Sequence, residues 1–261
     1  MTTVIIPVDF STTSLHAANY ASELFMGHED ITLLLYHSYS KRSEAEKAEL
    51  ALDELKNKLV EEFSIKAEVL AHESSDFIEG LERVVRHRTA KLVIMGITER
   101  SVLAQTFVGS DTLKMAQTKA CPVLVVPEKA SFRPIKNVML SSDFKDTVNT
   151  TPSGPIKDFL ELFKPNLHIV NVDSEHYIAI TEAYENEKRK LQQMFEAYNP
   201  EFYFLRLYDV DDALNLFAEA KSIDINIAIQ KDHSFIQKLL LRSRTKSLSY
   251  HSHIPVLIIH S

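Results

Sequence analysis

Short apolar runs alternate with longer segments of helical period along the whole chain. Val4–Phe10, Ile31–Tyr39 and Lys91–Ile97 have the length and composition of strands, and the segments between them space apolar residues three and four positions apart. Strands that are joined through helices run parallel, with right-handed crossovers. The pattern therefore predicts an α/β fold in which helices cover both faces of a parallel sheet.

The first half of the chain reads as five strands and four helices. The expected strands are Val4–Phe10, Ile31–Tyr39, Ile65–Ala71, Lys91–Ile97 and Cys121–Val126, and the expected helices are Leu15–Met26, Lys41–Phe63, Ser75–Arg88 and Ser110–Lys119. In the second of these helices, Leu50, Leu52, Leu55 and Leu59 are expected to form the apolar stripe that faces the sheet. The result is a doubly wound, five-stranded sheet.

The second half repeats the first. Ile5–Ser11 recurs as Met139–Lys145, and Pro122–Val126 recurs as Pro255–Ile259. Between these anchors the expected strands are Leu167–Val172, Phe202–Tyr208 and Ile225–Ile229, and the expected helices are Ile178–Tyr198, Asp211–Ser222 and Leu239–His251. A repeat that spans the whole unit indicates duplication of one domain.

The duplication sets the expected domain organisation. We expect a first domain over residues 1–128, a linker over residues 129–136, and a second domain over residues 137–261. The last strand of such a domain lies at a sheet edge, and edges are usually covered. Pro122–Val126 and Pro255–Ile259 are therefore predicted to pack across a pseudo-two-fold axis, so that the chain mimics a dimer of single domains. A further homodimer is left open.

Charge and cysteine content narrow the function classes. The net charge is -7 and neither half is basic, which disfavours binding to nucleic acid or to an anionic membrane. The sequence has no apolar run long enough to span a bilayer, and Met1–Val4 has no charged leader region. The single cysteine, Cys121, lies in an apolar stretch and is expected to be an inert core thiol. A cytoplasmic protein is expected.

Two stretches are candidates for a ligand site. In a doubly wound sheet, ligands bind at the carboxyl ends of the strands, where the strand order reverses. Pro7–Ser11 follows the first strand, and Met95–Thr112 follows the fourth. Gly109 and Ser110 open a predicted helix whose free N–H groups suit a phosphate, and Gly96 leaves space for one to pass. The alternative is that Gly96 serves a tight strand exit and Ser110 only caps the helix.

These features resemble the universal stress protein family, once in each half. The likeness rests on Val8-Asp9-Phe10-Ser11, on the terminus Cys121–Val126, and on the loop between them. Nucleotide-binding members carry glycine, two residues, glycine, nine residues, glycine, and serine or threonine. This chain has Gly96, Glu99, Gly109 and Ser110 at that spacing, so an acid replaces the second glycine.

The resemblance implies two tandem α/β domains, each a five-stranded parallel sheet of order 3-2-1-4-5. It also implies an adenine nucleotide, ATP or AMP, in the first domain, with magnesium accompanying ATP. Asp9 would lie near the adenine or ribose, and Ser38, which replaces an apolar residue usual there, near the base edge. The full set of implied nucleotide-binding residues is Pro7, Asp9, Ser38, Met95, Gly96, Thr98, Gly109, Ser110 and Thr112.

Two acids bear on this phosphate site. A carboxylate about 4 Å from a phosphate costs about 4 kcal/mol per charge pair at an effective dielectric of about 20. A bridging divalent ion, or rotation of Glu99 into solvent, would remove much of that cost. Asp111 has a simpler role open to it, as an acid that stabilises the helix N-terminus. Arg100 would either neutralise Glu99 or contact a phosphate.

The second half has lost most of this motif. Gln230 stands at the place of Gly96, and Arg242-Ser243 at the place of Gly109-Ser110. An arginine side chain blocks close backbone approach, although the basic run from Lys238 to Lys246 either attracts an anion through its side chains or is simply a solvated face. Asp143 remains without phosphate partners. The second domain is therefore expected to be degenerate.

Three functions stay open. The first is a non-catalytic stress-response protein that binds an adenine nucleotide in its first domain. The second is a nucleotide-free scaffold that acts through protein contacts, and the third is a slow ATP-hydrolysing enzyme. We expect no enzyme, because the sequence has no nucleophile elbow, P-loop lysine or acid pair, although a weak ATPase activity stays open. His251, His253 and His260 lack cysteine or carboxylate partners at ligand spacing, so no metal site is expected.

Overall fold

The computed structural model describes residues 2–98, 111–171, 182–205, 210–230 and 253–261. The chain divides into two compact units, Met1–Phe132 and Arg133–Ser261, and the division falls within the stretch that the sequence suggests as a linker. Each unit is described by itself. The predicted packing of the last strands against each other concerns the placement of the two units and stays a prediction.

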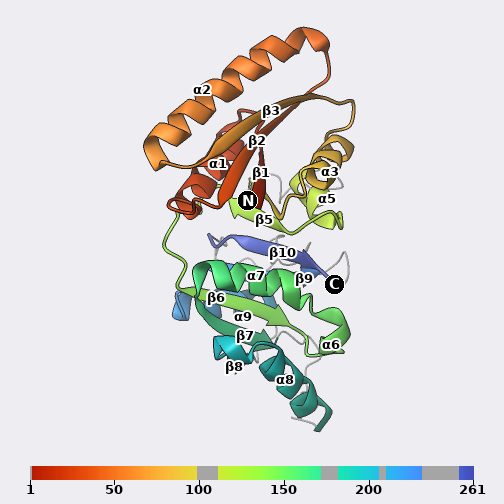
Figure 1. Ribbon diagram of the computed structural model, residues 1–261. Coiled ribbons are helices and arrows are strands. Elements are labelled where there is room, and N and C mark those ends of the chain that lie inside the picture. Colours follow the sequence, from red (N-terminus) through yellow and green to blue (C-terminus); the bar gives the residue numbers. More distant parts are fainter. Residues whose placement is uncertain (1, 99–110, 172–181, 206–209, 231–252) are drawn as a thin grey trace. The chain divides into compact units, whose positions relative to one another are not determined.

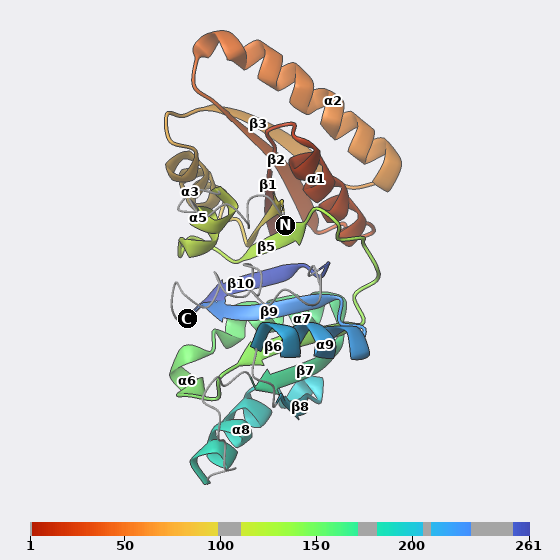
Figure 2. The same cartoon turned by 180° about the vertical axis from the view of Figure 1, so that it is seen from behind.

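The first unit is a doubly wound α/β sheet (Figure 1). Its elements are β1 (Thr2–Pro7), α1 (Thr12–Leu24), β2 (Ile31–Tyr39), η1 (Arg42–Glu44), α2 (Ala45–Phe63), β3 (Ala67–Glu73), α3 (Phe77–His87), β4 (Leu92–Ile97), α5 (Asp111–Gln117) and β5 (Val123–Pro127). All strand pairs are parallel and the order is β3-β2-β1-β4-β5, which confirms the predicted fold and strand order. Helices α1 and α2 cover one face, and α3 and α5 the other (Figure 1, Figure 2).

The core of the first unit follows from its strand sequences. Ile5, Leu34, Val93 and Leu124 come from four neighbouring strands and are all fully buried, as expected for a sheet covered on both faces. Cys121 is buried as well, and this burial raises the pKa of its thiol to about 12, which makes it a poor nucleophile.

The apolar stripe predicted for α2 is only partly correct. Leu52 and Leu59 are fully buried, whereas Leu50 is 60% exposed. Residues seven apart lie two turns apart on one helix face, while residues two apart point in nearly opposite directions. Leu52 and Leu59 therefore face the sheet, and Leu50 faces solvent.

The second unit has the same architecture. Its elements are β6 (Asn137–Ser142), α6 (Thr147–Thr150), α7 (Ser153–Phe163), β7 (Asn166–Asn171), α8 (Glu182–Met194), η2 (Glu196–Tyr198), β8 (Glu201–Phe204), α9 (Val210–Ala220), β9 (Ile225–Gln230) and β10 (Val256–His260). The strands are parallel in the order β8-β7-β6-β9-β10. The predicted helix 239–251 lies outside the described residues.

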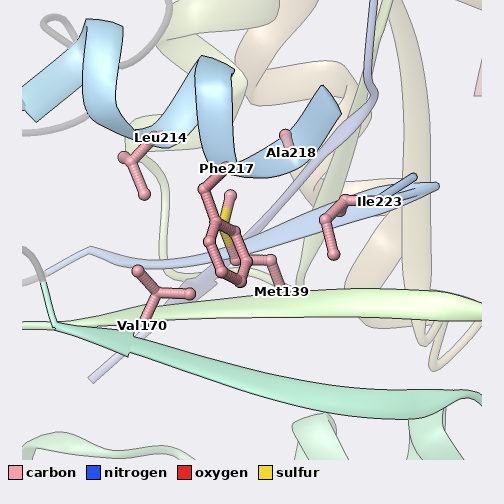
Figure 3. Packing of buried hydrophobic residues seen from close by; sticks show 6 residues of the cluster. All are labelled: Met139, Val170, Leu214, Phe217, Ala218 and Ile223. Atoms are coloured by element: carbon pink, nitrogen blue, oxygen red, sulfur yellow. The ribbon is translucent and has the colours of Figure 1, made fainter. Parts of the chain in front are cut away.

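One side of this second sheet is closed by α9. Leu214, Phe217 and Ala218 project from that helix at spacings of three and four, and Phe217 lies over Met139 of β6 (Figure 3). The packed set consists of Met139, Val170, Leu214, Phe217, Ala218 and Ile223. The apolar face of α9 thus packs on this part of the sheet. No helix in the described part of the chain is long and apolar enough to cross a membrane.

Candidate functional site

A cleft of about 1080 Å³ opens in the first unit where β1, β2 and β4 end. It brings together seven of the nine residues that the resemblance implies for the site, which are Pro7, Asp9, Ser38, Met95, Gly96, Thr98 and Thr112. The other two, Gly109 and Ser110, lie outside the described residues, as do Glu99 and Arg100. The cleft occupies the carboxyl edge of the sheet beside β1 and β4, between which the strand order reverses.

The turn between β1 and α1 forms one wall of the cleft. Ser11 donates from its backbone N and its Oγ to Asp9 Oδ1, at 3.0 and 2.6 Å. Ser11 Oγ also accepts from Ser14 N at 3.2 Å and so caps the N-terminus of α1. Aspartate and serine form such turns because their short polar side chains bond to the nearby backbone. The turn holds the Asp9 carboxylate at the cleft.

The charge state of Asp9 follows from these bonds. Burial raises its pKa, but the hydrogen bonds from the Ser11 side chain and from the backbone outweigh that effect, and the pKa lies below its ordinary value. Asp9 is therefore a carboxylate at neutral pH. A carboxylate offers about four acceptor positions, and Ser11 uses two of them.

Phe10 adopts an unusual backbone conformation in the same turn. Its φ is 62°, in the left-handed region that bulky residues rarely occupy. The ring of Phe10 packs against His37, with the ring centroids 5.1 Å apart. His37 Nδ1 lies 2.6 Å from the carbonyl oxygen of Val8, and because a carbonyl only accepts, Nδ1 carries the hydrogen. In the neutral ring, Nε2 is then an acceptor.

Gly96 lines the cleft, and the direction in which a side chain would project from it is filled by the protein itself. A Cβ at this position would lie 2.5 Å from the carbonyl oxygen of Thr13 and 2.6 Å from its methyl group. Glycine is thus needed because the first turn of α1 packs directly on the end of β4. This geometry supports a structural role at the strand exit, and a contact between Gly96 and a phosphate stays a prediction.

Thr112 also serves the protein itself. Its Oγ1 donates to the carbonyl oxygen of Gly96 at 2.8 Å, and the residue is 6% exposed. Its hydroxyl hydrogen is therefore already used within the protein. Asp111, beside it, lies 3.2 Å from the Nζ of Lys114 one turn along α5.

The far wall of the cleft contains residues that the sequence analysis did not assign to the site. Glu44 and Lys47 come from η1 and α2, and Ser74 and Ser75 follow β3. The serines could have been found, because they stand at the carboxyl end of a predicted strand. Glu44 and Lys47 sit in a charged helical stretch that carries no motif, and only the fold brings them to the cleft.

The first unit matches a known family. The model of the universal stress protein family covers residues 1–127. A comparison with curated proteins finds no match to the chain.

Solved structures match both units together. A universal stress protein from Archaeoglobus fulgidus DSM 4304 covers 99% of this chain and 96% of its own, with 16% identity and a TM-score of 0.66. A protein of unknown function from Pseudomonas aeruginosa PAO1 covers 99% and 92%, with 14% identity and a TM-score of 0.61. The cytoplasmic domain of a prokaryotic cation chloride cotransporter covers 98% and 94%, with 11% identity and a TM-score of 0.57. At these identities the likeness shows the fold alone.

The turn that carries Asp9 in the first unit is repeated in the second unit. Lys145 N donates to Asp143 Oδ1 at 3.1 Å, and Phe144 has a φ of 55°, as Phe10 has in the first turn. Phe144, however, is only 4% exposed and stacks on Tyr184 with centroids 5.0 Å apart. Phe202 and Phe204 pack on it at 6.1 and 6.3 Å. In this unit, aromatic rings cover the turn that lines the cleft in the first.

The structure describes only two of the three histidines near the C-terminus that were considered as metal ligands. His251 lies outside the described residues, while His253 and His260 lie within them. Within those described residues, no three histidine, cysteine, aspartate or glutamate side chains gather in a way that could hold a metal ion.

Proposed function

We propose that the protein is a non-catalytic binding protein of the universal stress protein family, whose first unit binds an adenine nucleotide, AMP or ATP. The observation that carries this proposal is the cleft at the reversal of strand order, where Asp9, Ser38 and Met95 come together from three strand ends. A volume of about 1080 Å³ is ample for a nucleotide. The family match over residues 1–127 supports the ligand class.

The chemistry of the walls suits a nucleoside portion. The Asp9 carboxylate has acceptor positions left for ribose hydroxyls, and Ser38 lies on the neighbouring strand β2. Met95 and Phe77 supply apolar surface that a flat base can cover. The lining thus combines apolar surface with many polar side chains that can fix the orientation of a ligand.

A binding role is proposed rather than catalysis because of the state of Asp9. A general base works best with a pKa near the operating pH, and hydrogen bonds lower the pKa of Asp9 from a value that is already acidic. Asp9 therefore anchors a ligand better than it moves a proton.

The second unit is proposed to be a structural partner. Phe144, Tyr184, Phe202 and Phe204 pack together over the turn that corresponds to the ligand-binding turn of the first unit. This cluster favours a scaffold role for that unit, and Gln230 in place of Gly96 agrees with it.

Thermal unfolding of the full chain with AMP, with ATP, and with ATP and magnesium tests the proposal. A ligand at about 100 times its Kd stabilises the folded protein by about 2.7 kcal/mol, and a shift of the unfolding temperature is expected with at least one of these ligands. Equal unfolding temperatures with and without every ligand would remove adenine nucleotides and leave the scaffold function for both units.

A further inference from the structure

We propose that the cleft selects its adenine ligand by charge, and that it holds the uncharged nucleoside more tightly than the phosphorylated forms. The inference rests on the proposed adenine binding in the first unit. It concerns which member of that ligand class the described walls fit best.

Four hydroxyl groups of the walls donate to the protein itself. Ser11 Oγ donates to Asp9 at 2.6 Å, and Ser14 Oγ donates to the Ser11 carbonyl at 3.1 Å. Ser74 Oγ donates to the Asp76 carbonyl at 2.6 Å, and Thr112 Oγ1 donates to the Gly96 carbonyl at 2.8 Å. Each hydroxyl has one hydrogen to donate and keeps acceptor capacity. These four hydroxyl groups can therefore accept hydrogen bonds from a ligand, while their own hydrogens are already used.

Other polar groups add to this acceptor character. The Asp9 carboxylate only accepts, and the Nδ1 hydrogen of His37 is already donated to the Val8 carbonyl. A nucleoside matches such a wall, because its ribose hydroxyls and exocyclic amine donate. The oxygens of an ionised phosphate are acceptors, and they need donors or cations.

The charges on the walls point the same way. Among the described lining residues, Asp9, Glu44 and Asp111 are acids and Lys47 is the one ammonium group. Lys114 offsets Asp111 in part, from 3.2 Å. Each phosphate added to the ligand brings further negative charge to a wall that already carries a negative excess.

Isothermal titration of the full-length protein with adenosine, AMP and magnesium ATP, at matched ionic strength, tests the inference. Adenosine is expected to bind at least about tenfold more tightly than ATP, with AMP between them. Added salt screens charges and is expected to narrow that ratio. AMP or ATP binding more tightly than adenosine would overturn the charge selection while leaving adenine binding in place. No binding of any of the three would overturn the proposed function as well.

A pair of variants tests whether the charge of the cleft wall itself lowers the affinity for AMP. Asp111→Asn removes a charge from the wall and is expected to raise AMP affinity about fivefold without changing adenosine affinity. Glu79→Gln is the matched control, because it removes the same charge from α3, where Glu79 pairs with Arg83 outside the cleft. Equal effects of the two variants on AMP binding would overturn a local selection by the wall.

Discussion

Thr13 and Gly96 lie so close together that no side chain fits between them. The carbonyl oxygen of Thr13 is 2.5 Å from the position of a Cβ on residue 96, a distance that real Cβ atoms essentially never show. The contact joins the first turn of α1 to the end of β4 and so fixes the two elements that carry the cleft. A glycine that looks like part of a phosphate motif is here required by packing.

Replacing Gly96 is expected to cost stability. In Gly96→Ala the new methyl group meets backbone, which cannot move aside as a flexible side chain can, and a loss of about 1–3 kcal/mol in the free energy of unfolding is expected from urea titration. Gly154→Ala is the matched control. A Cβ at residue 154, in α7, meets nothing within 4 Å, so that variant is expected to be neutral or to gain about 0.4–1 kcal/mol. Equal stabilities of the two variants would contradict the packing role.

Phe10 and Phe144, which both have a left-handed backbone conformation, are expected to lose different amounts of stability when they are replaced by alanine. Phe144→Ala is expected to lose about 3–5 kcal/mol of unfolding free energy, because it removes a buried ring that contacts Tyr184, Phe202 and Phe204. Phe10→Ala removes a half-buried ring and is expected to lose clearly less. Alanine keeps the Cβ in both cases, so the backbone strain is the same. A larger loss from Phe10→Ala would contradict the description of the aromatic cluster.

Acidification is expected to weaken the second unit through His168. Burial lowers the pKa of this ring below its ordinary value of 6.5, although Glu201 acts in the opposite direction. The unfolded chain therefore takes up the proton first as the pH falls, and stability that is fully present above about pH 6.5 is lost below it. Urea midpoints between pH 7.5 and pH 5 check this. His168→Gln should flatten that part of the profile, and an unchanged slope would refute the assignment.

A separate loss is expected at lower pH through Glu187. Hydrogen bonds from Lys190 and from Thr147 lower its pKa to about 2, from an ordinary value of 4.5. The stability that Glu187 contributes is present above pH 4.5 and is lost as the pH falls toward 2. Glu187→Gln is therefore expected to unfold more easily than the parent chain at pH 6 and to approach it at pH 2 to 3. A constant difference across that range would show that the carboxylate charge plays no part.

The positions of the strands can be predicted from the sequence because each strand is a short run of apolar residues. β2 has the predicted bounds, Ile31–Tyr39, because a run of apolar residues can be recognised in the sequence without any knowledge of the fold. The helices α6 and α7 were not predicted, because Pro152, Gly154 and Pro155 interrupt the helical pattern there.

The site is harder to predict from the sequence because its side-chain contacts join residues that are far apart in the chain. The turn at Asp9 could be predicted, as aspartate and serine act on their own backbone. The role of Gly96 depends on Thr13, and the tautomer of His37 depends on the carbonyl of Val8, and both partners are distant in the chain. Lys47 reaches the cleft only through the packing of α2.

Titration of adenosine and AMP into a pair of aspartate variants tests the central claim most directly. Asp9→Asn keeps Oδ1, which receives both bonds from Ser11, and replaces the other acceptor oxygen with a donor amide. Asp143→Asn makes the same change in the equivalent turn of the second unit, where Lys145 N donates to Oδ1. The account predicts that Asp9→Asn weakens adenosine binding at least about tenfold, and AMP binding by less because a negative charge is also removed, while Asp143→Asn binds both as the parent does. Unchanged binding by Asp9→Asn, or an equal loss in both variants, would contradict a ligand site in the first unit.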